Sequence, residues 1–401
     1  MGHNSRAGDR LTQQMRIGIL AGEVSGDNLG AGLMRAMREL SPGLQFLGVG
    51  GPAMTAEGLQ SLASMEALAV NGFRDPIIHL PRLWRLLKTL ESAMADGSID
   101  VFVGVDFNVF NFLLEARLKK RGIRTVHYVS PSVYAWRRGR TRRLARIADV
   151  ILCLFPFEPE FYAGLDIQAV FVGHPLADEI DFAQSSERAK RRAREQLEFP
   201  DGVTVIALLP GSRRSEISLM LPVFQQAAAQ IQERMERRGR KVLFVLPCVR
   251  PELRDYIDDL LLDGPEIDCR VYTGNARRGL VACDAALVKS GTSTLEAMLL
   301  HRPMVVSYKL GALSYQLAKR LMKSPYVALP NILAGDMLVP ELLQNDATPS
   351  ALADALLKEL DASESDADYL RAFTDIHNVL QRQADATAAN AVLHLLGVGS
   401  R

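Results

Sequence analysis

The chain alternates short apolar runs with helical segments almost from end to end, and this alternation limits the folds open to it. Helical patterns such as Phe110–Arg121 and Leu219–Arg238 separate the runs. Strands that alternate with helices favour parallel sheets, so we predict an α/β fold with doubly wound sheets that bind ligands at the carboxyl ends of strands. The strand-like runs are Arg16–Ala21, Gln45–Val49, Val101–Val105, Thr125–Val129, Val150–Phe155, Ala169–Val172, Thr204–Leu209, Lys241–Leu246, Arg270–Tyr272, Ala285–Val288 and Met304–Tyr308.

The length of 401 residues exceeds what one hydrophobic core usually covers, which predicts two domains. The charged stretch Ser185–Glu198 is the expected junction. A cleft between two such domains is the default ligand site. We therefore expect a disordered tail over 1–15, Rossmann-like domains over 16–184 and 185–369, and C-terminal helices over 370–401 that pack back on the first domain.

Composition excludes several classes of protein. With 48% hydrophobic residues and a net charge of +1, the chain is unlike a general nucleic-acid binder. No apolar run approaches the roughly 18 residues that span a bilayer. No Walker loop, metal-ligand cluster or Ser–His–Asp signature occurs, so neither cofactor nor metal is expected. The cysteines are scattered and are predicted to be reduced core thiols: Cys153, Cys248, Cys269 and Cys283.

The stretch Ala285–Leu300 places a hydroxyl-rich turn between a buried strand and an apolar helix. A helix N-terminus presents backbone N–H groups and a positive dipole end, which favour phosphate. Glu296 is expected in the first turn, where it would accept hydrogen bonds from ribose hydroxyls. An ordinary N-cap is the structural alternative. The turn consists of Ser290, Gly291, Thr292, Ser293 and Thr294.

A second turn, within Leu208–Glu216, repeats this pattern and adds cations. Gly211 and Ser212 allow the backbone to approach a ligand, and the Arg213 guanidinium matches phosphate oxygens bidentately. An exposed arginine pair is the alternative explanation. Two phosphate-friendly turns in one domain predict a diphosphate site. A third polar turn carries Asn331, which can both donate and accept hydrogen bonds.

The first half contains two further strand-end turns. Asp106 ends a parallel strand and is a candidate general base, or else a helix cap. The turn Ala21–Asp27 lacks the G-x-G-x-x-G spacing of dinucleotide sites. Substrate contact and capping by Asp27 are equal alternatives there. The candidate substrate contacts in this turn are Glu23, Ser25, Gly26 and Asp27.

The segment Asp75–Leu90 interleaves apolar and basic side chains, as a helix lying in a lipid interface does. A surface helix with its apolar face on the core has the same pattern. The nearby loop Tyr128–Arg140 includes the candidate Ser130 and crowds aromatic and basic residues. It is either a solvated basic segment or one attracted to a phosphate or an anionic membrane surface. The candidate membrane contacts are Ile77, Ile78, Leu80, Arg82, Leu83, Trp84 and Arg85.

Together these motifs resemble the lipid-A-disaccharide synthase family of bacterial glycosyltransferases. The order and spacing of the motifs carry the resemblance, which runs from about Arg16 to His394. The motifs are Ala21–Asp27, Gly48–Pro52, Tyr128–Arg137, Leu209–Arg213, Ser290–Thr292 with Glu296, and Leu329–Gly335.

The resemblance implies a GT-B fold, with two facing Rossmann-like domains, and metal-independent transfer from a UDP-sugar. The implied donor is UDP-2,3-diacylglucosamine and the implied acceptor is 2,3-diacylglucosamine 1-phosphate, joined by a β-1,6 bond with release of UDP. Inversion at the anomeric carbon requires a base for the acceptor 6-hydroxyl and positive groups for the departing diphosphate. A peripheral location on the cytoplasmic face of the inner membrane, and a homodimer, are also implied.

The resemblance assigns roles position by position. Asp106 matches the catalytic aspartate of the family, Arg213 its diphosphate-binding arginine, and Asn331 its essential asparagine. The Ser290–Ser293 turn with Glu296 matches the cradle for UDP.

The chain also departs from the family pattern. In the motif D-x-P-D-F-N, Asn108 replaces the proline and Val109 replaces the second carboxylate, while Tyr134 stands where the family usually shows Trp. These changes imply a slower enzyme or a variant acceptor. Two alternatives stay open: another UDP-sugar enzyme of this fold, such as a UDP-N-acetylglucosamine 2-epimerase or a peptidoglycan-type transferase, and a non-catalytic nucleotide-sugar-binding protein.

Overall fold

The computed structural model describes residues 15–68, 76–95, 97–131, 139–248, 250–311, 324–363 and 367–398. The chain divides into two compact units. Unit 1 comprises residues 1–175 and 380–401, and unit 2 comprises residues 176–379. Residues 1–14 of the expected tail, and Tyr134 with its neighbours in the aromatic and basic loop, lie outside the described residues.

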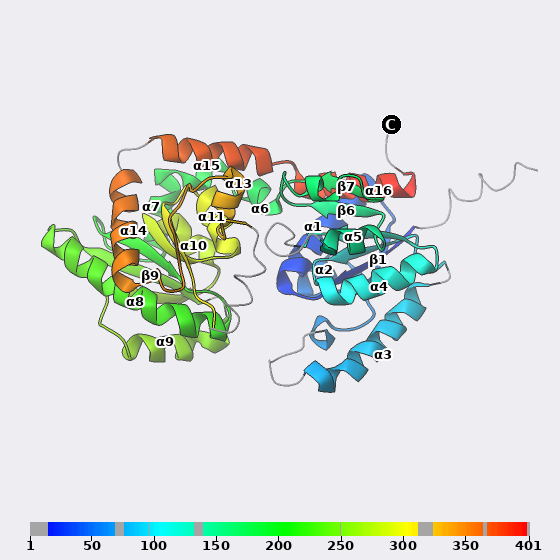
Figure 1. Ribbon diagram of the computed structural model, residues 1–401, viewed down its shortest axis with the longest axis horizontal. Coiled ribbons are helices and arrows are strands. Elements are labelled where there is room, and N and C mark those ends of the chain that lie inside the picture. Colours follow the sequence, from blue (N-terminus) through cyan, green and yellow to red (C-terminus); the bar gives the residue numbers. More distant parts are fainter. Residues whose placement is uncertain are drawn as a thin grey trace, which may run out of the picture. The chain divides into compact units, whose positions relative to one another are not determined.

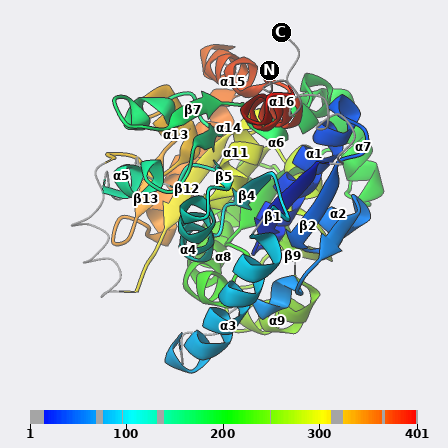
Figure 2. The same ribbon diagram turned by 90° about the vertical axis from the view of Figure 1, so that its right-hand side faces the viewer.

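Unit 1 is built on a seven-stranded parallel sheet with the order β3-β2-β1-β4-β5-β6-β7. Figure 2 shows β2, β1, β4 and β5 side by side in this sheet. The strand order reverses between β1 and β4, where Ala21 pairs with Val105, and a doubly wound sheet binds ligands at such a point. The strands are β1 (Arg16–Ala21), β2 (Gln45–Val49), β3 (Leu59–Ser61), β4 (Val101–Val105), β5 (Arg124–Tyr128), β6 (Val150–Cys153) and β7 (Gln168–Phe171).

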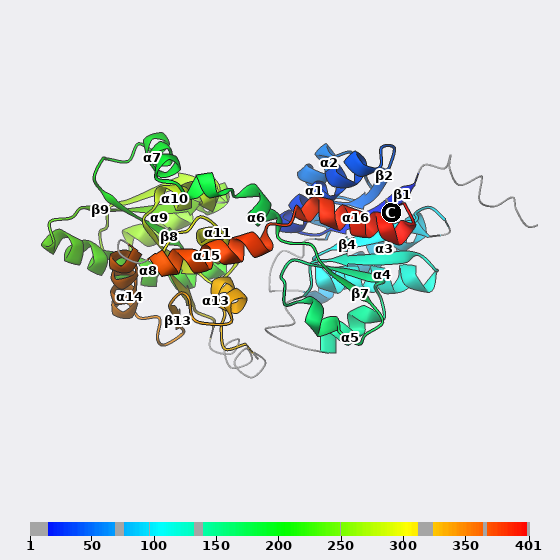
Figure 3. The same ribbon diagram turned by 90° about the horizontal axis from the view of Figure 1, so that it is seen from above.

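The helices of unit 1 come from both ends of the chain. The final helix, α16, packs beside α1 (Figure 3). On another part of the unit, the C-terminal half of α3 contributes Leu87, Leu90 and Met94 to a core shared with Leu20 and Phe102. The helices are α1 (Val24–Leu40), α2 (Pro52–Ala56), α3 (Pro76–Met94), α4 (Asn108–Lys120), α5 (Gly139–Ala145) and α16 (Ala384–Leu396), with short 3-10 helices at Met65–Ala67 and Pro159–Tyr162.

Unit 2 repeats the design with a six-stranded parallel sheet, ordered β10-β9-β8-β11-β12-β13. Its strand order reverses between β8 and β11. The strands are β8 (Thr204–Leu209), β9 (Val242–Cys248), β10 (Cys269–Thr273), β11 (Ala285–Lys289), β12 (Met304–Tyr308) and β13 (Glu341–Leu343).

Helices α8 and α14 lie side by side over this second sheet and enclose its main core with β8, β9 and β11 (Figure 1). The helices are α6 (Pro175–Glu179), α7 (Glu187–Gln196), α8 (Arg214–Arg237), α9 (Arg254–Leu262), α10 (Ala276–Ala282), α11 (Thr292–Leu299), α13 (Leu329–Ala334), α14 (Pro349–Ser363) and α15 (Ala367–Leu380), with 3-10 helices at Phe182–Ser185 and Pro251–Leu253.

Every strand-like run of the sequence forms a strand, with ends shifted by at most one or two residues. Strands β3 and β13 were not predicted, because three residues are too short to show a pattern. The charged stretch expected at the junction forms α7, which starts at the N-cap Ser186 and belongs to unit 2. The predicted helix Leu219–Arg238 begins earlier, at Arg214, and contains Pro222.

The four cysteines are free. Cys153, Cys248 and Cys283 are buried, as predicted, whereas Cys269 is only half-buried. Among the described residues, no helix is both long enough and apolar enough to cross a bilayer.

Candidate functional site

Two strand–turn–helix segments lie next to each other in unit 2, because β8 pairs in parallel with β11. The turn Gly211–Arg213 connects β8 to α8, and the turn Ser290–Gly291 connects β11 to α11. Neighbouring parallel strands end at the same edge of a sheet. The structure therefore brings both sequence-predicted phosphate turns, and the N-termini of two helices, to one edge.

Glu216, in the first turn of α8, organises the first of these turns. Its Oε2 accepts hydrogen bonds from the backbone N–H groups of Ser212 (3.1 Å) and Arg213 (3.3 Å). Its Oε1 lies 3.0 Å from Nζ of Lys289, the last residue of β11. Burial would raise the pKa of Glu216, but Lys289 and the two N–H groups hold it below its ordinary value. An ion pair thus ties the two turns together.

Gly211 is required by this arrangement. Its φ of +120° lies in the region that favours glycine. A Cβ at this position would lie 2.6 Å from Oε2 of Glu216. The sequence indicated close approach of a ligand to Gly211, and the structure shows that the Glu216 side chain already approaches it.

The second turn is held by hydroxyl groups. Ser290 Oγ donates to the carbonyl of Val327 (2.9 Å), and Thr294 Oγ1 donates to the carbonyl of Gly291 (2.7 Å). Thr292 is exposed and Ser293 is half-buried at the start of α11. The first turn of α11 holds no acidic residue, so its positive dipole end is not offset from within that turn.

Glu296 lies further along α11 than the sequence indicated. The helix begins at Thr292, and its first turn contains no acidic residue, which corrects the expected position. Oε1 of Glu296 lies 3.8 Å from Nε of Arg277, which also pairs with Glu179 at 3.0 Å. Burial raises the pKa of Glu296, and Arg277 partly opposes this effect.

Asn331 is completely buried in α13, with its side chain engaged by the protein. Its Nδ2 donates to the Val339 carbonyl and to Glu341 Oε1, both at 2.9 Å, and its Oδ1 accepts from Val339 N–H at 2.9 Å. Glu341 also accepts from the N–H of Val327, whose carbonyl receives the Ser290 hydroxyl. Asn331 thus holds the segment that supports the Ser290 turn.

Asp106 follows β4 in unit 1 and has an unusual backbone conformation. The φ angles of Asp106 and Phe107 are +47° and +46°, a region that costs non-glycine residues about 1–3 kcal/mol each. Asn111 Nδ2 donates to the carbonyls of Asp106 (2.8 Å) and Val105 (3.2 Å). The Asp106 N–H donates to the backbone carbonyl of Tyr128 (2.8 Å). Strain that is held in place by surrounding bonds is typical of functional sites.

The neighbouring strand end adapts to this conformation. Gly22, just after β1, faces the Phe107 ring so closely that a Cβ would lie 2.4 Å from a ring atom. Glycine at this position is therefore a packing requirement. Val109 is 80% exposed at the start of α4.

Asp27 is a helix cap, but for α2 rather than for its own helix. Its buried carboxylate accepts hydrogen bonds from the N–H groups of Gly51 (2.7 Å), Ala53 (2.9 Å) and Met54 (3.0 Å). These bonds satisfy N–H groups that a helix start leaves without intrahelical partners. The capping alternative concerned the helix that follows the Ala21–Asp27 turn, whereas the structure shows Asp27 bound through both carboxylate oxygens to the backbone at the start of α2.

The other candidates of this turn differ in exposure. Glu23 and Ser25 are exposed at the start of α1. Gly26 is buried, and a Cβ there would lie 3.4 Å from the Val105 carbonyl oxygen. Ser130, at the end of β5, is buried with its Oγ 2.9 Å from the hydroxyl of Tyr162. Glu23 and Ser25 are thus the members that face solvent.

The described side chains of helix α3 follow the surface-helix alternative, with apolar residues on the core and basic residues exposed. Leu87 is buried in the core and Leu83 packs against it. Arg82 and Arg85 are exposed, and Trp84 is 48% exposed. The Arg117 guanidinium lies over the Trp84 ring, with its Cζ 4.4 Å from the ring centroid. The side chains of three further candidates lie outside the described residues: Ile77, Ile78 and Leu80.

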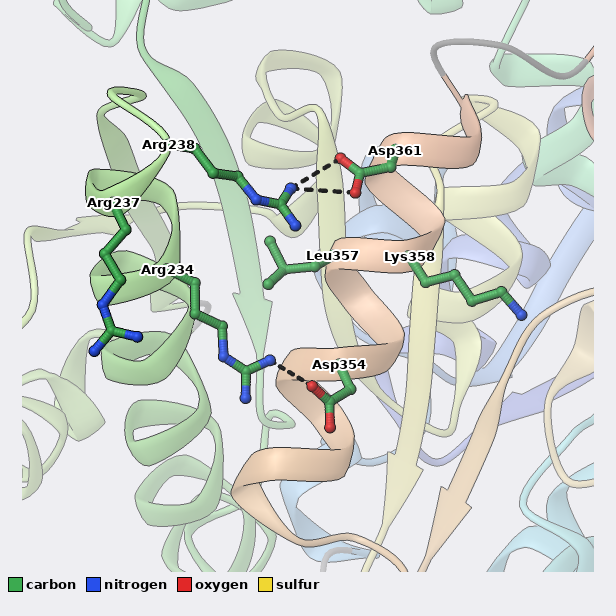
Figure 4. A pocket seen from close by; sticks show the side chains of 7 residues that line it. All are labelled: Arg234, Arg237, Arg238, Asp354, Leu357, Lys358 and Asp361. Atoms are coloured by element: carbon green, nitrogen blue, oxygen red, sulfur yellow. Dashed lines mark hydrogen bonds and ion pairs between the residues drawn. The ribbon is translucent and has the colours of Figure 1, made fainter.

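Two hollows in unit 2 lie away from these turns. One, of about 540 Å³, lies between α8 and α14 near the far end of α8, and ion pairs join Arg234 to Asp354 and Arg238 to Asp361 across it (Figure 4). The other, of about 570 Å³, adjoins Thr204, the first residue of β8. Because ligands of doubly wound sheets bind at the opposite ends of the strands, neither hollow is the candidate site.

The described residues contain no group of three or more His, Cys, Asp or Glu side chains that could hold a metal ion. The candidate site combines Arg213 with two helix N-termini, while the Lys289 ammonium is paired with Glu216.

Sequence comparison decides the family. The model of the lipid-A-disaccharide synthetase family matches residues 17–392. The chain belongs to this family. The lipid-A-disaccharide synthase of Pseudomonas fluorescens (strain SBW25) is 46% identical over 383 residues, which cover 96% of this chain and 98% of the relative. That of Azotobacter vinelandii is 44% identical over 382 residues, 95% and 98% of the two chains. The protein is therefore a glycosyltransferase with lipid-A-disaccharide synthase activity, as its motifs predicted.

Solved structures share the fold at low sequence identity. A glycosyltransferase from Rickettsia africae has a TM-score of 0.56 at 9% identity, over 96% of this chain and 98% of its own. The UDP-GlcNAc 2-epimerase from Neisseria meningitidis bound to UDP-GlcNAc has a TM-score of 0.60 at 12% identity, over 95% and 99%. These likenesses, together with the two parallel sheets, confirm the predicted GT-B fold class.

Four residues of these networks received no role from the sequence: Asn111, Glu216, Lys289 and Glu341. Glu216 alone has a local signal, because it follows the N-cap Arg213 by three residues, the spacing of a capping box. Asn111 bonds to the carbonyls of Val105 and Asp106, only six and five residues earlier. Lys289 meets Glu216 across 73 residues of sequence, and no local pattern indicates that partner.

Proposed function

We propose that this enzyme moves 2,3-diacylglucosamine from its UDP donor to the 6-hydroxyl of 2,3-diacylglucosamine 1-phosphate. The hydroxyl oxygen attacks the anomeric carbon while the bond from that carbon to the UDP phosphate oxygen breaks, and UDP keeps the electron pair. The hydroxyl proton passes to Asp106. A single displacement on an α-linked donor gives the β-1,6 product.

The observation that carries the donor assignment is the pair of linked turns at the ends of β8 and β11. In this proposal Arg213, the turn Gly211–Ser212 and the turn Ser290–Ser293 bind the diphosphate, and Glu296 binds the ribose. Positive groups fixed before the reaction stabilise the charge that develops on the leaving UDP. Asn331 acts by holding the Ser290 turn through Glu341 and Val327.

The strained backbone of Asp106 supports its role as the base. Glu23, Ser25, Gly26 and Asp27 belong to the same edge of the unit 1 sheet, because β1 pairs with β4. Their exposure separates two roles. Glu23 and Ser25 contact the acceptor, while Asp27 shapes the neighbouring Gly51 turn. Ser130 belongs to the same proposal, at the end of the adjacent β5.

UDP release by the purified protein tests the reaction. Release is measured with UDP-2,3-diacylglucosamine, with and without the acceptor, for the native enzyme and for Asp106→Asn. We expect acceptor-dependent release that falls at least about 100-fold in the variant, because a positioned base contributes about that much. Asp100→Asn is the matched control, since Asp100 lies just before β4, at its opposite end, and binds the Arg16 N–H.

The other outcomes are equally informative. Acceptor-dependent release that survives in Asp106→Asn would move the base elsewhere, with Glu23 tested next. UDP release that does not depend on the acceptor, or UDP binding without any release, would contradict the proposed donor and acceptor.

Contact with an anionic membrane surface is the second part of the proposal. Trp84 is exposed with Arg82 and Arg85 beside it, an arrangement that suits a helix at a lipid interface. Co-sedimentation with phosphatidylglycerol-containing vesicles tests this contact. The variant Arg82→Glu/Arg85→Glu should bind at least about tenfold more weakly, because each cation near an anionic surface contributes about 1 kcal/mol.

The matched control is Arg191→Glu/Arg192→Glu on the exposed face of α7, which changes net charge equally. Equal loss in both variants would reduce the effect to net charge and count against an α3 contact. Location at the cytoplasmic face of the inner membrane and a homodimer rest on the family resemblance. Membrane contact by Ile77, Ile78 and Leu80 rests on the apolar and basic pattern of Asp75–Leu90. Light scattering of the purified protein tests the dimer.

A further inference from the structure

An ion pair joins the two phosphate turns of unit 2. Lys289 Nζ lies 3.0 Å from Glu216 Oε1, and the two side chains are 14% and 20% exposed. Nζ also lies 4.8 Å from the centroid of the Tyr308 ring on the next strand. A Cβ added to Gly291 would lie 3.9 Å from Nζ, which places this cation beside the start of α11. The ammonium group is thus fixed between both turns.

The partner carboxylate presents an electrostatic problem. Glu216 occupies two N–H groups of the turn that the proposed function assigns to the diphosphate. An ionised carboxylate so close to phosphates would repel them strongly, because this environment is largely shielded from water. The same carboxylate is needed to shape the turn, since Gly211 packs directly against it. The turn therefore requires the Glu216 carboxylate, but the charge of this group must be neutralised for the donor diphosphate to bind.

We propose that Lys289 sets the affinity for the donor by neutralising Glu216 and by holding the Gly211–Arg213 turn against the Ser290 turn. Lys289 is accordingly a positioning residue, which acts on the diphosphate through Glu216. This role rests on the proposed diphosphate site in unit 2. It explains how a turn that is held by the Glu216 carboxylate can still bind an anionic ligand.

This role predicts opposite effects on UDP affinity when Lys289 and when Glu216 loses its charge. Lys289→Met leaves the Glu216 charge without its cation, so UDP should bind at least about tenfold more weakly. Glu216→Gln keeps an oxygen that can accept from the Ser212 and Arg213 N–H groups and removes the charge, so UDP should bind at least as tightly as to the native protein. A purely structural pair would lose affinity in both variants.

The double variant Lys289→Met/Glu216→Gln decides whether Lys289 acts through Glu216. Calorimetry with UDP should give a Kd within about threefold of the native value, because neither charge remains. In turnover assays, Lys289→Met should raise the KM for the donor and leave kcat nearly unchanged, and Lys289→Arg should restore the KM. The loss of affinity should shrink as salt rises.

Arg237→Met is the matched control, because Arg237 pairs with Glu233 at 2.5 Å on the same helix but near its other end. UDP affinity in this variant should equal that of the native protein, and thermal unfolding identifies variants that lose their fold. Native affinity in Lys289→Met would overturn the proposal. Weak binding by the double variant would overturn it as well, in favour of direct contact between Lys289 and phosphate. If the native enzyme failed to bind UDP at all, the proposed function itself would be wrong.

Discussion

Two polar residues that the sequence marked as site residues, Asp27 and Asn331, are saturated with hydrogen bonds inside their own units. Asp27 accepts hydrogen bonds from three backbone N–H groups, and Asn331 makes three hydrogen bonds with Val339 and Glu341. A motif shows that a residue type is needed at a position, but the need can be to build the site rather than to contact its ligand. The distinction depends on buried partners, which no local pattern shows.

Asn331 gives a test of this distinction by stability and pH. Asn331→Ala should reduce the free energy of unfolding by about 2–4 kcal/mol, because it leaves buried Val339 groups without partners. In the native protein, Asn331 Nδ2 lies 2.9 Å from Glu341 Oε1. Asn331→Asp keeps the Oδ1 acceptor but replaces Nδ2 by a second carboxyl oxygen beside Glu341. Two carboxylates repel when both are ionised, so this variant should lose more stability at about pH 8 than at about pH 5. Urea unfolding at both pH values measures this, and an equal loss would contradict it.

Short turns after strands are the elements to which the proposed function assigns the site residues in both units. The sequence predicted most of their strands and helices, because alternation and apolar runs are local properties. It placed Glu296 in the first turn of α11, which is wrong because that helix begins at Thr292. Helix starts depend on backbone bonds that the sequence shows poorly. The turn after β6 contains Glu158, whose carboxyl group has a raised pKa that only its burial explains.

Glu158 is 1% exposed, and its Oε2 accepts from Phe155 N–H at 3.0 Å. Burial raises the pKa of Glu158 to about 8, from an ordinary 4.5. Between those values the folded protein keeps a proton that the unfolded chain releases. The contribution to stability is therefore full below about pH 4.5 and is lost as pH rises through about 8.

Glu158→Gln should remove this loss, so the variant should gain stability relative to the native protein between about pH 5 and pH 8. Tryptophan fluorescence during urea unfolding measures the effect in unit 1, which contains both tryptophans, Trp84 and Trp136. A difference that stays constant across this pH range would show that Glu158 does not titrate there.

At the scale of the whole molecule, the chain completes unit 1 with its last segment. His174 N–H donates to the Leu380 carbonyl at 3.0 Å, and α16 then packs along α1 (Figure 3). Gly32 of α1 faces Asp385 so closely that a Cβ would lie 2.2 Å from its carboxylate. The buried face of α16 consists of Ala384, Ala388, Ala389, Val392 and Leu393.

Removing residues 381–401 should therefore destabilise unit 1 by several kcal/mol, because the apolar face that α16 covers becomes exposed. The fluorescence transition of Trp84 and Trp136 should move to lower urea concentration. UDP binding, which the proposed function assigns to unit 2, should persist at native affinity where unit 2 stays folded. An unchanged fluorescence transition would show that α16 contributes little to the stability of unit 1.

The sequence by itself determined the α/β class, the positions of most strands, the two phosphate-friendly turns and the family. These features are local, or lie in motifs whose order along the chain can be read directly. Only the tertiary structure decided that Lys289 meets Glu216, which lies 73 residues earlier, and that Asn331 supports the Ser290 turn through Glu341. Such pairs depend on which strands become neighbours and on burial. Both are properties of the assembled sheet, so the chain order alone does not reveal them.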